Sequence, residues 1–549
     1  MEIFNIENLS FKYSGCDEKA IEDVSLSIKK DEFIVLCGAT GSGKSTLLKM
    51  LKRELTPLGE LTGDVYFKNK KLNELTAKES VSSIGFVMQR PEHQIVTDKV
   101  WHELAFGLEN LNVPKSKIAA RIAETSCFFG IENWYERDVS ELSGGQKQLL
   151  NLAAVMVMQP EVLILDEPLS QLDPIAASEF VAMLKKINTE LSTTIIIAEH
   201  SLEEIIPLCD KLVVMEKGSV LFQGSAGEVI SKLKNNSEIM CAMPLAAQLF
   251  NSLNLSGECP LTVKKGRKMI ENNFENKIRL LPNEDYHHSK NKALEFKDVF
   301  FRYERNGSDI LKLDFSIYEN EIFFILGGNG SGKTTTLSVA AGIYKPYSGK
   351  IKVFGKKIND YKNQSLYRNC LALLPQDVQT MFLKNTVKEE LEEFGKEIDF
   401  PFDFTPLYDK HPYDLSGGQQ QLLGLAKVLA LKPKLLLLDE PTKGLDAYTK
   451  KAFSEILKKL KENGITIVAV THDIEFAAVC ADRCALFFKG NIVSQAPPTE
   501  IFSENHFYTT AASRMTRGFF DNAVTMEQTL QLCAINAGKG GETYDGNQE

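Results

Sequence analysis

Two glycine-rich stretches of the chain combine a lysine with a hydroxyl residue directly after it. They read GATGSGKS at residues 38–45 and GGNGSGKT at residues 327–334, and each lies between an apolar run and a helical run. Glycines let the backbone wrap around phosphates, so that successive N–H groups and a helix N-terminus face negative charge. The sequence therefore predicts two phosphate-binding loops in which Lys44 and Lys333 reach the β- and γ-phosphates of a nucleotide.

Adjacent carboxylates end two other apolar runs. VLILDEP covers residues 162–168 and LLLLDEP covers residues 435–441. The aspartates are placed to hold Mg²⁺ with the loop hydroxyls, so the expected metal ligands are Ser45, Asp166, Thr334 and Asp439. Glu167 and Glu440 then fall where a general base could polarise an attacking water molecule. Paired acids at a strand end are often only solvated, but beside two phosphate loops they favour a nucleotide hydrolase.

The motifs occur twice and in the same order along the chain. LSGGQ at residues 142–146 recurs at residues 415–419, ahead of the acidic pair in each half. The second half is shorter than the first chiefly between its glutamine (Gln89 or Gln376) and LSGGQ. Two copies of one ATPase fold, with one trimmed subdomain, explain this pattern. The predicted divisions are domains at 1–225 and 293–512, a linker or small appendage at 226–292 and a partly disordered C-terminal tail at 513–549.

The elements that must position these motifs predict an α/β fold in each half. Short apolar runs are typical of fully buried parallel strands, and the first half contains FIVLCG (33–38), VLILD (162–166) and TIIIAEH (194–200). The alternating run GDVYFKNK (63–70) fits an antiparallel side sheet. Helical spacing over residues 178–191 and 451–464 predicts helices between the strands.

Composition and charge argue against several classes of protein. At 549 residues the chain is too long for a single core. Its net charge of −10 and pI near 5.6 argue against a general nucleic-acid binder. No apolar run approaches the roughly 18–20 residues that cross a bilayer, and MEIFNIENLS at the N-terminus lacks the regions of a signal peptide. We therefore expect any membrane role to depend on a partner.

LSGGQ resembles the signature of the ATP-binding-cassette (ABC) family, and with the loops and acidic pairs the resemblance covers nearly the whole chain. It implies two tandem P-loop NTPase domains, each with a RecA-like core, an antiparallel β-subdomain and a helical signature subdomain. In that family two cassettes pair head to tail, and the signature of one caps the γ-phosphate held by the other. Ser143, Gly144, Gly145 and Gln146 would then serve the nucleotide on Lys333, and Ser416, Gly417, Gly418 and Gln419 the nucleotide on Lys44.

The resemblance also assigns roles to residues outside the signature. Tyr13 and Tyr303 match the aromatic residue that stacks on adenine, although a tyrosine here can simply pack on the sheet. The loop residues that would bind ATP are Gly38, Ala39, Thr40, Gly41, Ser42, Gly43, Lys44, Ser45, Thr46, Gly327, Gly328, Asn329, Gly330, Ser331, Gly332, Lys333, Thr334 and Thr335.

Two further pairs of residues match family positions at the γ-phosphate. Gln89 and Gln376 match the glutamine that senses Mg²⁺ and the γ-phosphate, so they join the expected metal ligands. His200 and His472 match the switch histidine, and both follow apolar runs. Neither half lacks its lysine, glutamate, histidine or signature. We therefore predict two hydrolytically competent sites.

The segment after Gln89 carries a narrower resemblance. MQRPEHQIVTDKVWHELAFGLEN (88–110) resembles the ATPases of energy-coupling-factor (ECF) importers, where an ABC importer docks its membrane partner. A diverged counterpart, LLPQDVQTMFLKNTVKEEL (373–391), has Gln379 and Phe382 in comparable places. Residues 244–270 also resemble the extension between the halves of double-cassette ECF ATPases.

This segment also has the pattern of a partner-binding groove. Apolar residues that share one helical face would form its floor and polar residues ahead of them its rim, namely Val100, Trp101, Leu104, Ala105 and Leu108, and Arg90, Glu92, His93 and Gln94. Such a groove suits an amphipathic helix of a partner. The alternative is that the apolar face packs on its own cassette while the charges are solvated.

These patterns together lead us to interpret the chain as the ATP-hydrolysing subunit of an ECF-type importer. The resemblance implies a peripheral protein on the cytoplasmic face of a bacterial membrane, with ATP and Mg²⁺ as cofactors. It implies a transmembrane coupling subunit and a small substrate-binding membrane protein as partners, and a vitamin or a metal ion as cargo.

Two alternative functions stay open. A ribosome-associated tandem cassette that acts in translation or antibiotic resistance also has two cassettes and no membrane span, but typically joins them by a long charged helical hairpin. Residues 226–292 are only slightly basic and contain Pro244, Pro260 and Pro282, which suit such a hairpin poorly. The other alternative is a double sugar-importer ATPase, whose second cassette usually departs from the catalytic pattern.

Overall fold

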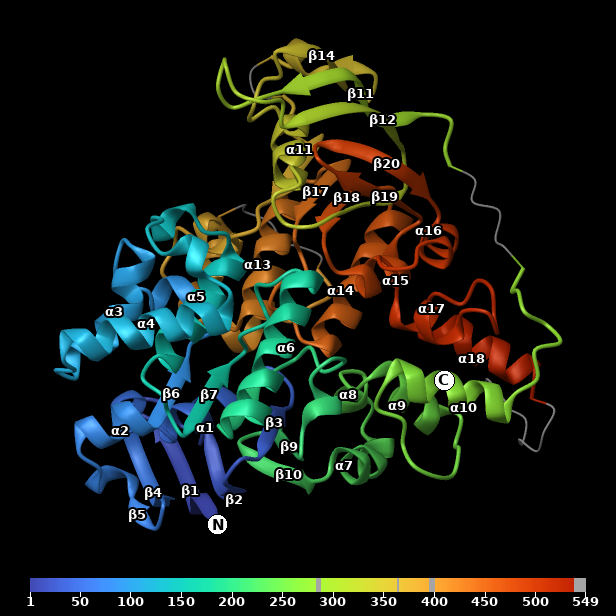
Figure 1. Ribbon diagram of the computed structural model, residues 1–549. Helices are drawn as coiled ribbons and strands as arrows, with labels where there is room; N and C mark the ends of the chain where they lie inside the picture. Colours follow the sequence, from blue (N-terminus) through green and yellow to red (C-terminus); the bar gives the residue numbers. More distant parts are fainter. Residues whose placement is uncertain (283–287, 363–364, 394–399, 538–549) are drawn as a thin grey trace. The chain divides into compact units, whose positions relative to one another are not determined.

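The computed structural model describes residues 1–282, 288–362, 365–393 and 400–537. The chain divides between Thr262 and Val263 into two compact units, which we call the first and the second unit (Figure 1). Most of the predicted tail beyond residue 512 is described and includes helices. Its last part, 538–549, lies outside the described residues, as do residues 283–287 of the predicted linker.

A six-stranded sheet brings the motifs of the first unit to one edge. Its order is β10-β9-β3-β8-β7-β6. The strands are β3 (Phe33–Cys37), β6 (Ile84–Val87), β7 (Val162–Asp166), β8 (Thr194–Ala198), β9 (Lys211–Glu216) and β10 (Ser219–Gly224). All neighbours pair in parallel except β10, so the predicted parallel strands β3, β7 and β8 are confirmed. Because these strands run in one direction, their carboxyl ends and the loops after them lie together.

A second, antiparallel sheet covers one face of the first unit. Its order is β2-β1-β4-β5, with β1 (Glu2–Tyr13), β2 (Ile21–Lys29), β4 (Gly59–Phe67) and β5 (Lys70–Lys71). β4 contains most of the alternating run, and its antiparallel pairing with β1 confirms that prediction. Apolar side chains of this sheet, of α1 (Lys44–Met50) and of β3 share one core, which fixes the helix that follows the phosphate loop.

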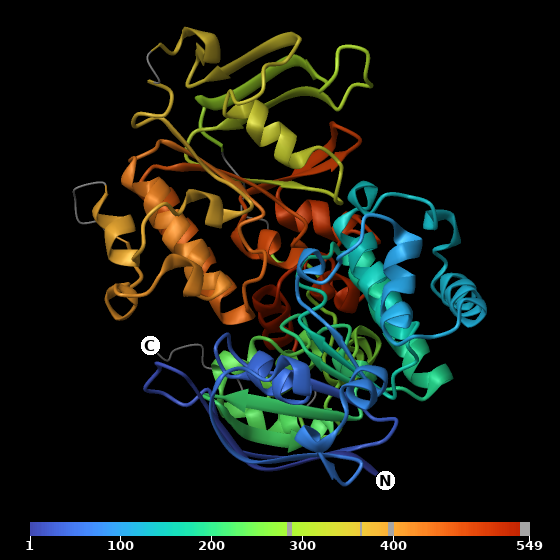
Figure 2. The same ribbon diagram turned by 90° about the vertical axis from the view of Figure 1, so that its left-hand side faces the viewer.

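The helices of the first unit fill the connections between its strands. Those between β5 and β8 are α2 (Ala77–Ser83), α3 (Val100–Asn110), α4 (Lys115–Phe129), α5 (Gly144–Met156) and α6 (Pro174–Leu191). Figures 1 and 2 show α3, α4 and α5 grouped together in this unit, and contacts among the three confirm the grouping. α6 contains the helix predicted over residues 178–191.

The strands of the second unit repeat this architecture. Its six-stranded sheet, β16-β17-β18-β13-β19-β20, matches the first sheet strand for strand, and its four-stranded sheet is β12-β11-β14-β15. The strands are β11 (Lys292–Phe301), β12 (Leu311–Tyr318), β13 (Ile322–Leu326), β14 (Ser348–Val353), β15 (Lys356–Lys357), β16 (Leu371–Leu374), β17 (Leu435–Asp439), β18 (Thr466–Thr471), β19 (Arg483–Phe488) and β20 (Asn491–Ala496).

The helices of the second unit reflect its shorter stretch between Gln376 and LSGGQ. Those from β13 onward are α11 (Lys333–Ala340), α12 (Val387–Glu392), α13 (Gly417–Ala430), α14 (Ala447–Glu462), α15 (Ile474–Cys480), α16 (Pro498–Glu504), α17 (Ala511–Thr516) and α18 (Met526–Ile535). α14 covers most of the helix predicted over residues 451–464. Among the described residues between β16 and α13, α12 is the one α-helix, whereas the first unit has both α3 and α4 there. The missing length therefore falls in the helical subdomain.

Residues of the predicted linker 226–292 belong partly to each unit. α7 (Ala226–Lys232), α8 (Ser237–Met240) and α9 (Leu245–Ser252) lie in the first unit, and α10 (Val263–Asn273) lies in the second. α10 packs against α17, and Arg279 pairs with Asp521 at 2.9 Å. We keep the boundaries at 225, 292 and 512 as a proposal about where the two repeated domains end.

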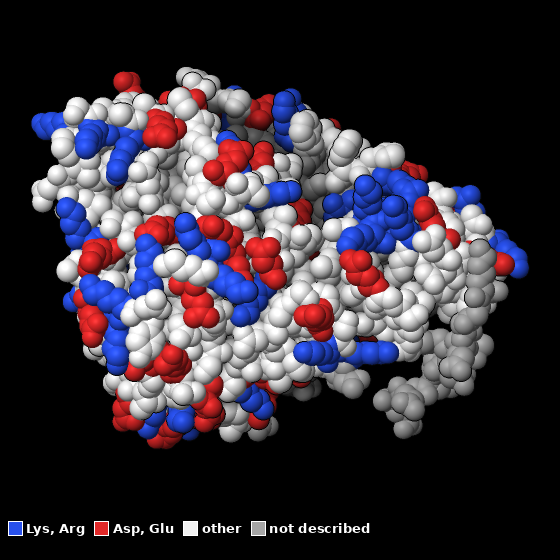
Figure 3. Space-filling view, turned by 60° about the horizontal axis from the view of Figure 1, so that its bottom comes forward, with Lys and Arg blue, Asp and Glu red and all other residues white. Residues whose placement is uncertain are grey.

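The surface and the helices agree with the charge and hydropathy of the sequence. On most of the face drawn in Figure 3, acidic and basic side chains alternate, as a net charge of only −10 leads one to expect. Within the described residues, no helix has both the length and the apolar composition that a bilayer span requires.

Candidate nucleotide-binding sites

The phosphate loop of the first unit connects β3 to α1. Gly43 precedes the helix with φ 96°, and a Cβ there would lie 2.5 Å from the carbonyl oxygen of Ala20, so only glycine fits. Lys44 is 4% exposed, and its Nζ donates to the carbonyl oxygens of Gly38 at 2.9 Å and Ala39 at 3.0 Å. The loop therefore folds around its own ammonium group.

The second unit builds the same loop between β13 and α11. Nζ of Lys333 donates to the carbonyl oxygens of Gly327 at 2.8 Å and Gly328 at 3.0 Å. Among the described residues, the buried hydroxyls of Ser42 and Ser331 find no hydrogen-bond partner. Buried hydroxyls in a loop of N–H groups are suited to bind phosphate oxygens, so both loops fit a nucleotide.

A hydroxyl and a carboxylate meet beside each loop. Ser45 Oγ donates to Oδ1 of Asp166 at 2.7 Å, and Thr334 Oγ1 donates to Oδ1 of Asp439 at 3.0 Å. Burial raises the pKa of Asp166, and it raises the pKa of Asp439 to about 6. A hard cation stabilises such buried carboxylates in their charged form, and an all-oxygen set of this kind fits Mg²⁺.

The candidate base of the first unit lies between two partners. Oε1 of Glu167 is 2.7 Å from Nε2 of His200, and Nε2 of Gln89 donates to Oε2 of Glu167 at 2.8 Å. The three residues follow β7, β8 and β6, which are consecutive in the sheet. The fold thus brings the three predicted catalytic residues of this unit together.

The second unit assembles its candidate base differently. Nδ1 of His472 is 2.9 Å from Oε2 of Glu440, and Nζ of Lys333 is 3.5 Å from Oε1. Burial acts to raise the pKa of Glu440, but the hydrogen bond and charge of His472, with the charge of Lys333, lower it overall. Gln376 is exposed and makes no hydrogen bond within the described part of the chain. The second glutamine is therefore not tied to its glutamate as Gln89 is.

Both candidate bases have a left-handed backbone. Glu167 has φ 46° and Glu440 has φ 48°, a conformation that non-glycine residues seldom adopt. Their N–H groups donate to the carbonyl oxygens of Ala198 and Val470, each at 2.9 Å. Strained backbone of this kind persists where surrounding contacts hold it and is concentrated at functional sites.

The predicted adenine-stacking tyrosines are tied to the phosphate-loop helices. The hydroxyl of Tyr13 is 2.9 Å from Oγ1 of Thr46, and that of Tyr303 is 2.8 Å from Oγ1 of Thr335. Tyr303 is 60% exposed. Both rings therefore lie at the loops, and Tyr303 has a face open to a ligand.

Each signature forms the N-terminus of a helix. Ser143 caps α5 and Ser416 caps α13, and in both cases the serine accepts from the N–H of the glutamine three residues later. The side chains of Gln146 and Gln419 accept from the N–H of these serines in return. Gly144 and Gly417 are exposed. The helix N-termini are thus open to an anion, while the glutamine side chains serve the cap.

Comparisons with known proteins find a matching family model, similar sequences and a partly similar solved structure. A family model described as ABC transporter matches residues 21–170 and 310–443. A Bacillus thuringiensis subsp. konkukian protein named as an ABC transporter ATP-binding protein is 42% identical over 96% of this chain and 98% of its own length. A Bacillus subtilis protein named as an HMP/thiamine import ATP-binding protein is 31% identical over 92% of this chain and 93% of its own length. The solved structure of cbiO1 from Clostridium perfringens, part of the ABC transporter complex cbiONQ, is 34% identical over 43% of this chain and 96% of that chain, with a TM-score of 0.38.

The chain belongs to the ABC transporter family. It is an ATP-hydrolysing ABC ATPase with two cassettes in tandem, because the family model matches once in each half. We call the matching part of each unit the first and the second cassette. The fold class predicted from the sequence is confirmed, with a parallel core, an antiparallel sheet and a helical part that carries the signature in each cassette.

The segment expected to form a docking groove is placed differently from our expectation. Four of the five apolar residues on α3 are at most 2% exposed, namely Val100, Leu104, Ala105 and Leu108. Most of the apolar face therefore packs on its own cassette, which was the alternative to a partner-binding groove. α3 packs on α4 and α5. Trp101 alone of the five expected floor residues reaches the surface, at 38% exposure.

The expected rim of that groove is partly correct. Arg90, Glu92 and His93 are exposed. Gln94 instead turns inward, since its Oε1 accepts from the N–H of Met88 and its Nε2 donates to the carbonyl oxygen of Phe86, both at 2.9 Å. An amide that satisfies the end of β6 cannot also face a partner.

The corresponding residues of the second cassette are also turned inward. Gln379 donates through Nε2 to Oε1 of Gln420 at 3.1 Å, and Phe382 is only 6% exposed. Leu383 is instead the exposed apolar residue there, at 78%. The pattern of apolar residues alone could not distinguish these neighbours.

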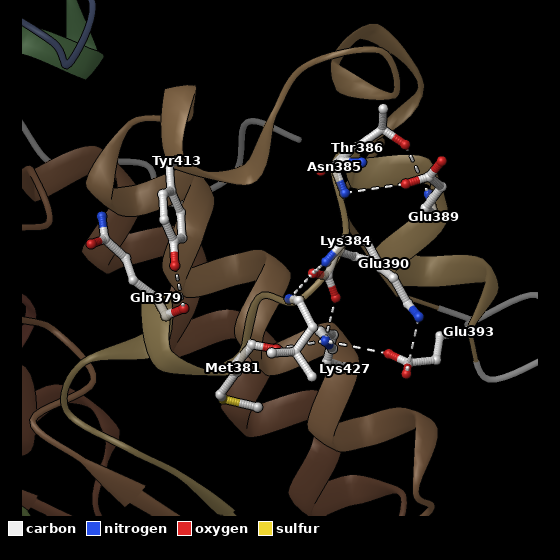
Figure 4. A network of polar contacts seen from close by, with 11 residues as sticks. Gln379, Met381, Lys384, Asn385, Thr386, Glu389, Glu390, Glu393, Tyr413 and Lys427 are labelled. Atoms are coloured by element: carbon white, nitrogen blue, oxygen red, sulfur yellow. Dashed lines mark hydrogen bonds and ion pairs between the residues drawn. The ribbon is translucent and has the colours of Figure 1, made fainter.

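A buried ion pair below this segment of the second cassette escaped the sequence analysis. Lys427 of α13 pairs with Glu390 of α12 and donates to the carbonyl oxygen of Met381 at 2.8 Å (Figure 4). Lys427 is 5% exposed and Glu390 is fully buried. Glu390 also accepts from the N–H of Lys384 at 2.6 Å. The pair thereby ties the signature helix to the segment after Gln376.

A buried carboxyl beside the first site was also missed. Glu199 directly precedes His200 and is 2% exposed. Burial raises its pKa to about 8, although N–H groups of Leu169, His200 and Ser201 act to lower it. The signal in the sequence was a carboxylic acid at the end of an apolar strand, next to the switch histidine.

Proposed function

We propose that this chain is the ATP-hydrolysing subunit of an ECF-type importer for a vitamin or metal-ion micronutrient. The observation that carries import is the 31% identity, over 92% of the chain, to a relative named as an HMP/thiamine import ATP-binding protein. Two complete sets of loop lysine, hydroxyl–aspartate pair and glutamate–histidine pair support turnover at both sites.

Each site in this proposal binds and orients ATP through its own residues. The loop N–H groups and Lys44 hold the phosphates of one nucleotide, and Lys333 holds those of the other. Mg²⁺ held by the hydroxyl–aspartate pairs, with Gln89 and Gln376 as the further ligands that we proposed, would neutralise charge on the β- and γ-oxygens. The fit of the oxygen sets described above supports this role.

The glutamates would then act as bases on the attacking water. Glu440, with its lowered pKa, is ionised at neutral pH and able to accept a proton. His200 and His472 hold the two carboxylates by the 2.7 and 2.9 Å contacts, and Gln89 adds a donor to Glu167. These roles of the six residues are proposals that the geometry supports.

Completion of each site would need the signature of the other cassette. We propose head-to-tail pairing within the chain, with Ser143 over the nucleotide on Lys333 and Ser416 over the nucleotide on Lys44. The exposed N-termini of α5 and α13 support it, because a capped helix start with open N–H groups stabilises a γ-phosphate.

Cysteine crosslinking tests this pairing. Cysteines introduced beside Ser143 and beside Lys333 should crosslink when ATP is bound to the Glu167→Gln/Glu440→Gln protein. The matched pair beside Ser416 and Lys44 should behave in the same way, whereas a pair beside Ser143 and Lys44 is the control and should not crosslink within one molecule. No crosslink of either matched pair would exclude the proposed arrangement.

The partners would be a transmembrane coupling subunit and a small substrate-binding membrane protein, at the cytoplasmic face of the membrane. The exposed residues Arg90, Glu92, Trp101 and Leu383 are the proposed contacts on the two cassettes. Solubilised membranes should yield the tagged chain together with small membrane proteins, and uptake of labelled thiamine is a first probe of cargo. Sedimentation of the chain with ribosomes instead would support the alternative function.

The region between the cassettes favours the importer over that alternative. Residues 226–273 form four short helices, α7 to α10, of which α10 is the longest at 11 residues. A ribosome-directed hairpin needs long continuous helices, which this stretch of the described chain lacks.

A further inference from the structure

Glu199 is a buried carboxyl for which the proposed hydrolysis has no use. It follows β8 and precedes His200. Its Oε1 accepts from the N–H of Leu169 at 2.7 Å, and its Oε2 accepts from the N–H of His200 at 3.0 Å. Both oxygens of one side chain are therefore engaged by backbone of two different segments.

These two segments carry the candidate base and its histidine. Leu169 lies two residues after Glu167, and the ring of His200 is 2.7 Å from the carboxylate of Glu167. The N–H of Glu199 also donates to the carbonyl oxygen of Leu36 at 3.2 Å, at the end of the strand that leads to the phosphate loop. Glu199 thus joins three strand ends around one catalytic pair.

The second cassette shows that the fold does not require a carboxyl here. Thr471 holds the corresponding place before His472, and its Oγ1 accepts from the N–H of Asp473 at 3.0 Å. Asp473 in turn pairs with Lys450 of α14 at 2.6 Å and caps α15. The loop after the switch histidine is therefore held from a helix in the second cassette and from inside the site in the first.

The first cassette lacks both residues that form this ion pair. Ser201 follows His200 as Asp473 follows His472. Ala177 lies as far after the aspartate that caps α6 as Lys450 lies after the aspartate that caps α14. A buried carboxyl is costly to keep unless it is hydrogen-bonded. Glu199 meets this condition through the N–H groups of Leu169 and His200, which places it beside the reacting groups.

We propose that Glu199 is the positioning residue of the first site, which fixes the backbone on both sides of Glu167 so that His200 keeps its contact with the base. The inference rests on the proposed roles of Glu167 and His200 and names the group that orients them. In the second site the Asp473–Lys450 pair, which involves the neighbouring helix α14, positions the loop after the histidine.

The test measures ATP hydrolysis by the full chain in a Glu440→Gln background, where the remaining turnover belongs to the first site. Glu199→Gln is nearly isosteric but replaces one acceptor oxygen by a donor, and Glu199→Thr copies the second cassette. Both should lower kcat about tenfold, the effect of losing one buried hydrogen bond that orients the base, while KM and binding of a fluorescent ATP analogue stay within about twofold.

A second comparison separates positioning from stability. Glu103 is another buried carboxyl of this cassette, which accepts from the N–H groups of Val96 and Thr97. Glu103→Gln in the same background should lower Tm without the tenfold loss of kcat. If Glu199→Gln lowers only Tm, as Glu103→Gln does, the positioning role is wrong.

Introducing the Asp473–Lys450 pair of the second cassette into the first cassette tests whether the lost activity can be rescued. Glu199→Thr with Ser201→Asp and Ala177→Lys should recover at least half of the lost activity, whereas Glu199→Thr with Ser201→Asp alone lacks the cation and should not. A triple variant as slow as Glu199→Thr, with ATP binding intact, would overturn the inference. Undiminished turnover of Glu167→Gln would instead reject the proposed base itself, whatever Glu199 does.

Discussion

In the first cassette the loop after the switch histidine is held by Glu199 from within the site, whereas in the second it is held by Asp473 and Lys450 from a neighbouring helix. The proposed loop lysine, base, histidine and glutamine are of the same residue type in both. The duplicated copies have therefore kept their reacting groups and changed the groups that support them.

The segments after the two glutamines repeat this contrast. Glu103 and Glu390 occupy the same place and are both buried. Glu390 pairs with Lys427, but Ala154 stands at the corresponding position of α5, and among the described residues no cation pairs with Glu103. Both carboxylates accept hydrogen bonds from N–H groups of their own loop, and in the second cassette the ion pair with Lys427 is added.

The largest effect is expected from the two bases. Glu167→Gln with Glu440→Gln should lower ATP hydrolysis by about 10²–10⁴-fold and leave ATP bound, because no carboxylate remains to accept the proton. Each single variant, assayed in single turnover, measures what the other site contributes, so unequal rates would quantify the difference between the cassettes. Brisk hydrolysis by the double variant would show that the bases are misassigned.

The buried ion pair of the second cassette should dominate the stability comparison. Lys427→Met leaves the Glu390 carboxylate without its cation and should destabilise this cassette by about 3–5 kcal/mol. Calorimetry or chemical denaturation of the full chain measures the shift. Lys427→Met with Glu390→Gln should be less damaging than the single change, and equal losses in both variants would argue against an uncompensated charge.

Changes at the rim should separate docking from hydrolysis. Arg90→Ala with Glu92→Ala should lower recovery of membrane partners about tenfold, the effect of ~1.4 kcal/mol of lost contact, while hydrolysis in detergent stays within about twofold. The matched change in the second cassette, Leu383→Ala, tests whether both cassettes dock. Unchanged recovery and uptake in the first variant would remove Arg90 and Glu92 from the proposed interface.

Thiol labelling should give the smallest and most local contrast. Cys16 and Cys127 of the first unit are exposed, whereas the four cysteines of the second unit, all described, are half-buried or buried. Burial raises the pKa of Cys480 to about 12, which keeps it as an unreactive thiol. A disulfide reagent should label the first unit first, and Cys16→Ser with Cys127→Ser should abolish that fast phase. Rapid labelling of Cys480 in the folded chain would contradict its burial.

The sequence by itself determined the parts whose chemistry lies in short, local spacing. A phosphate loop needs glycines, lysine and a hydroxyl within eight residues, so Lys44 and Lys333 could be located without a fold. Buried strands such as VLILD could be predicted as parallel because both faces are apolar. The acidic pairs were predicted from their places at the ends of such strands, whereas the histidines were assigned by the resemblance to the ABC family.

Only the tertiary structure decided which side chains meet across the fold. The apolar face of α3 has the same pattern whether a partner or α5 covers it, so burial of Val100 and Leu108 could not be read from spacing. Lys427 and Glu390 are far apart in the sequence, and Glu199 contacts Leu169 only because β7 and β8 are adjacent. The local sequence pattern indicates which contacts a residue is able to make, whereas tertiary packing determines which of them it makes.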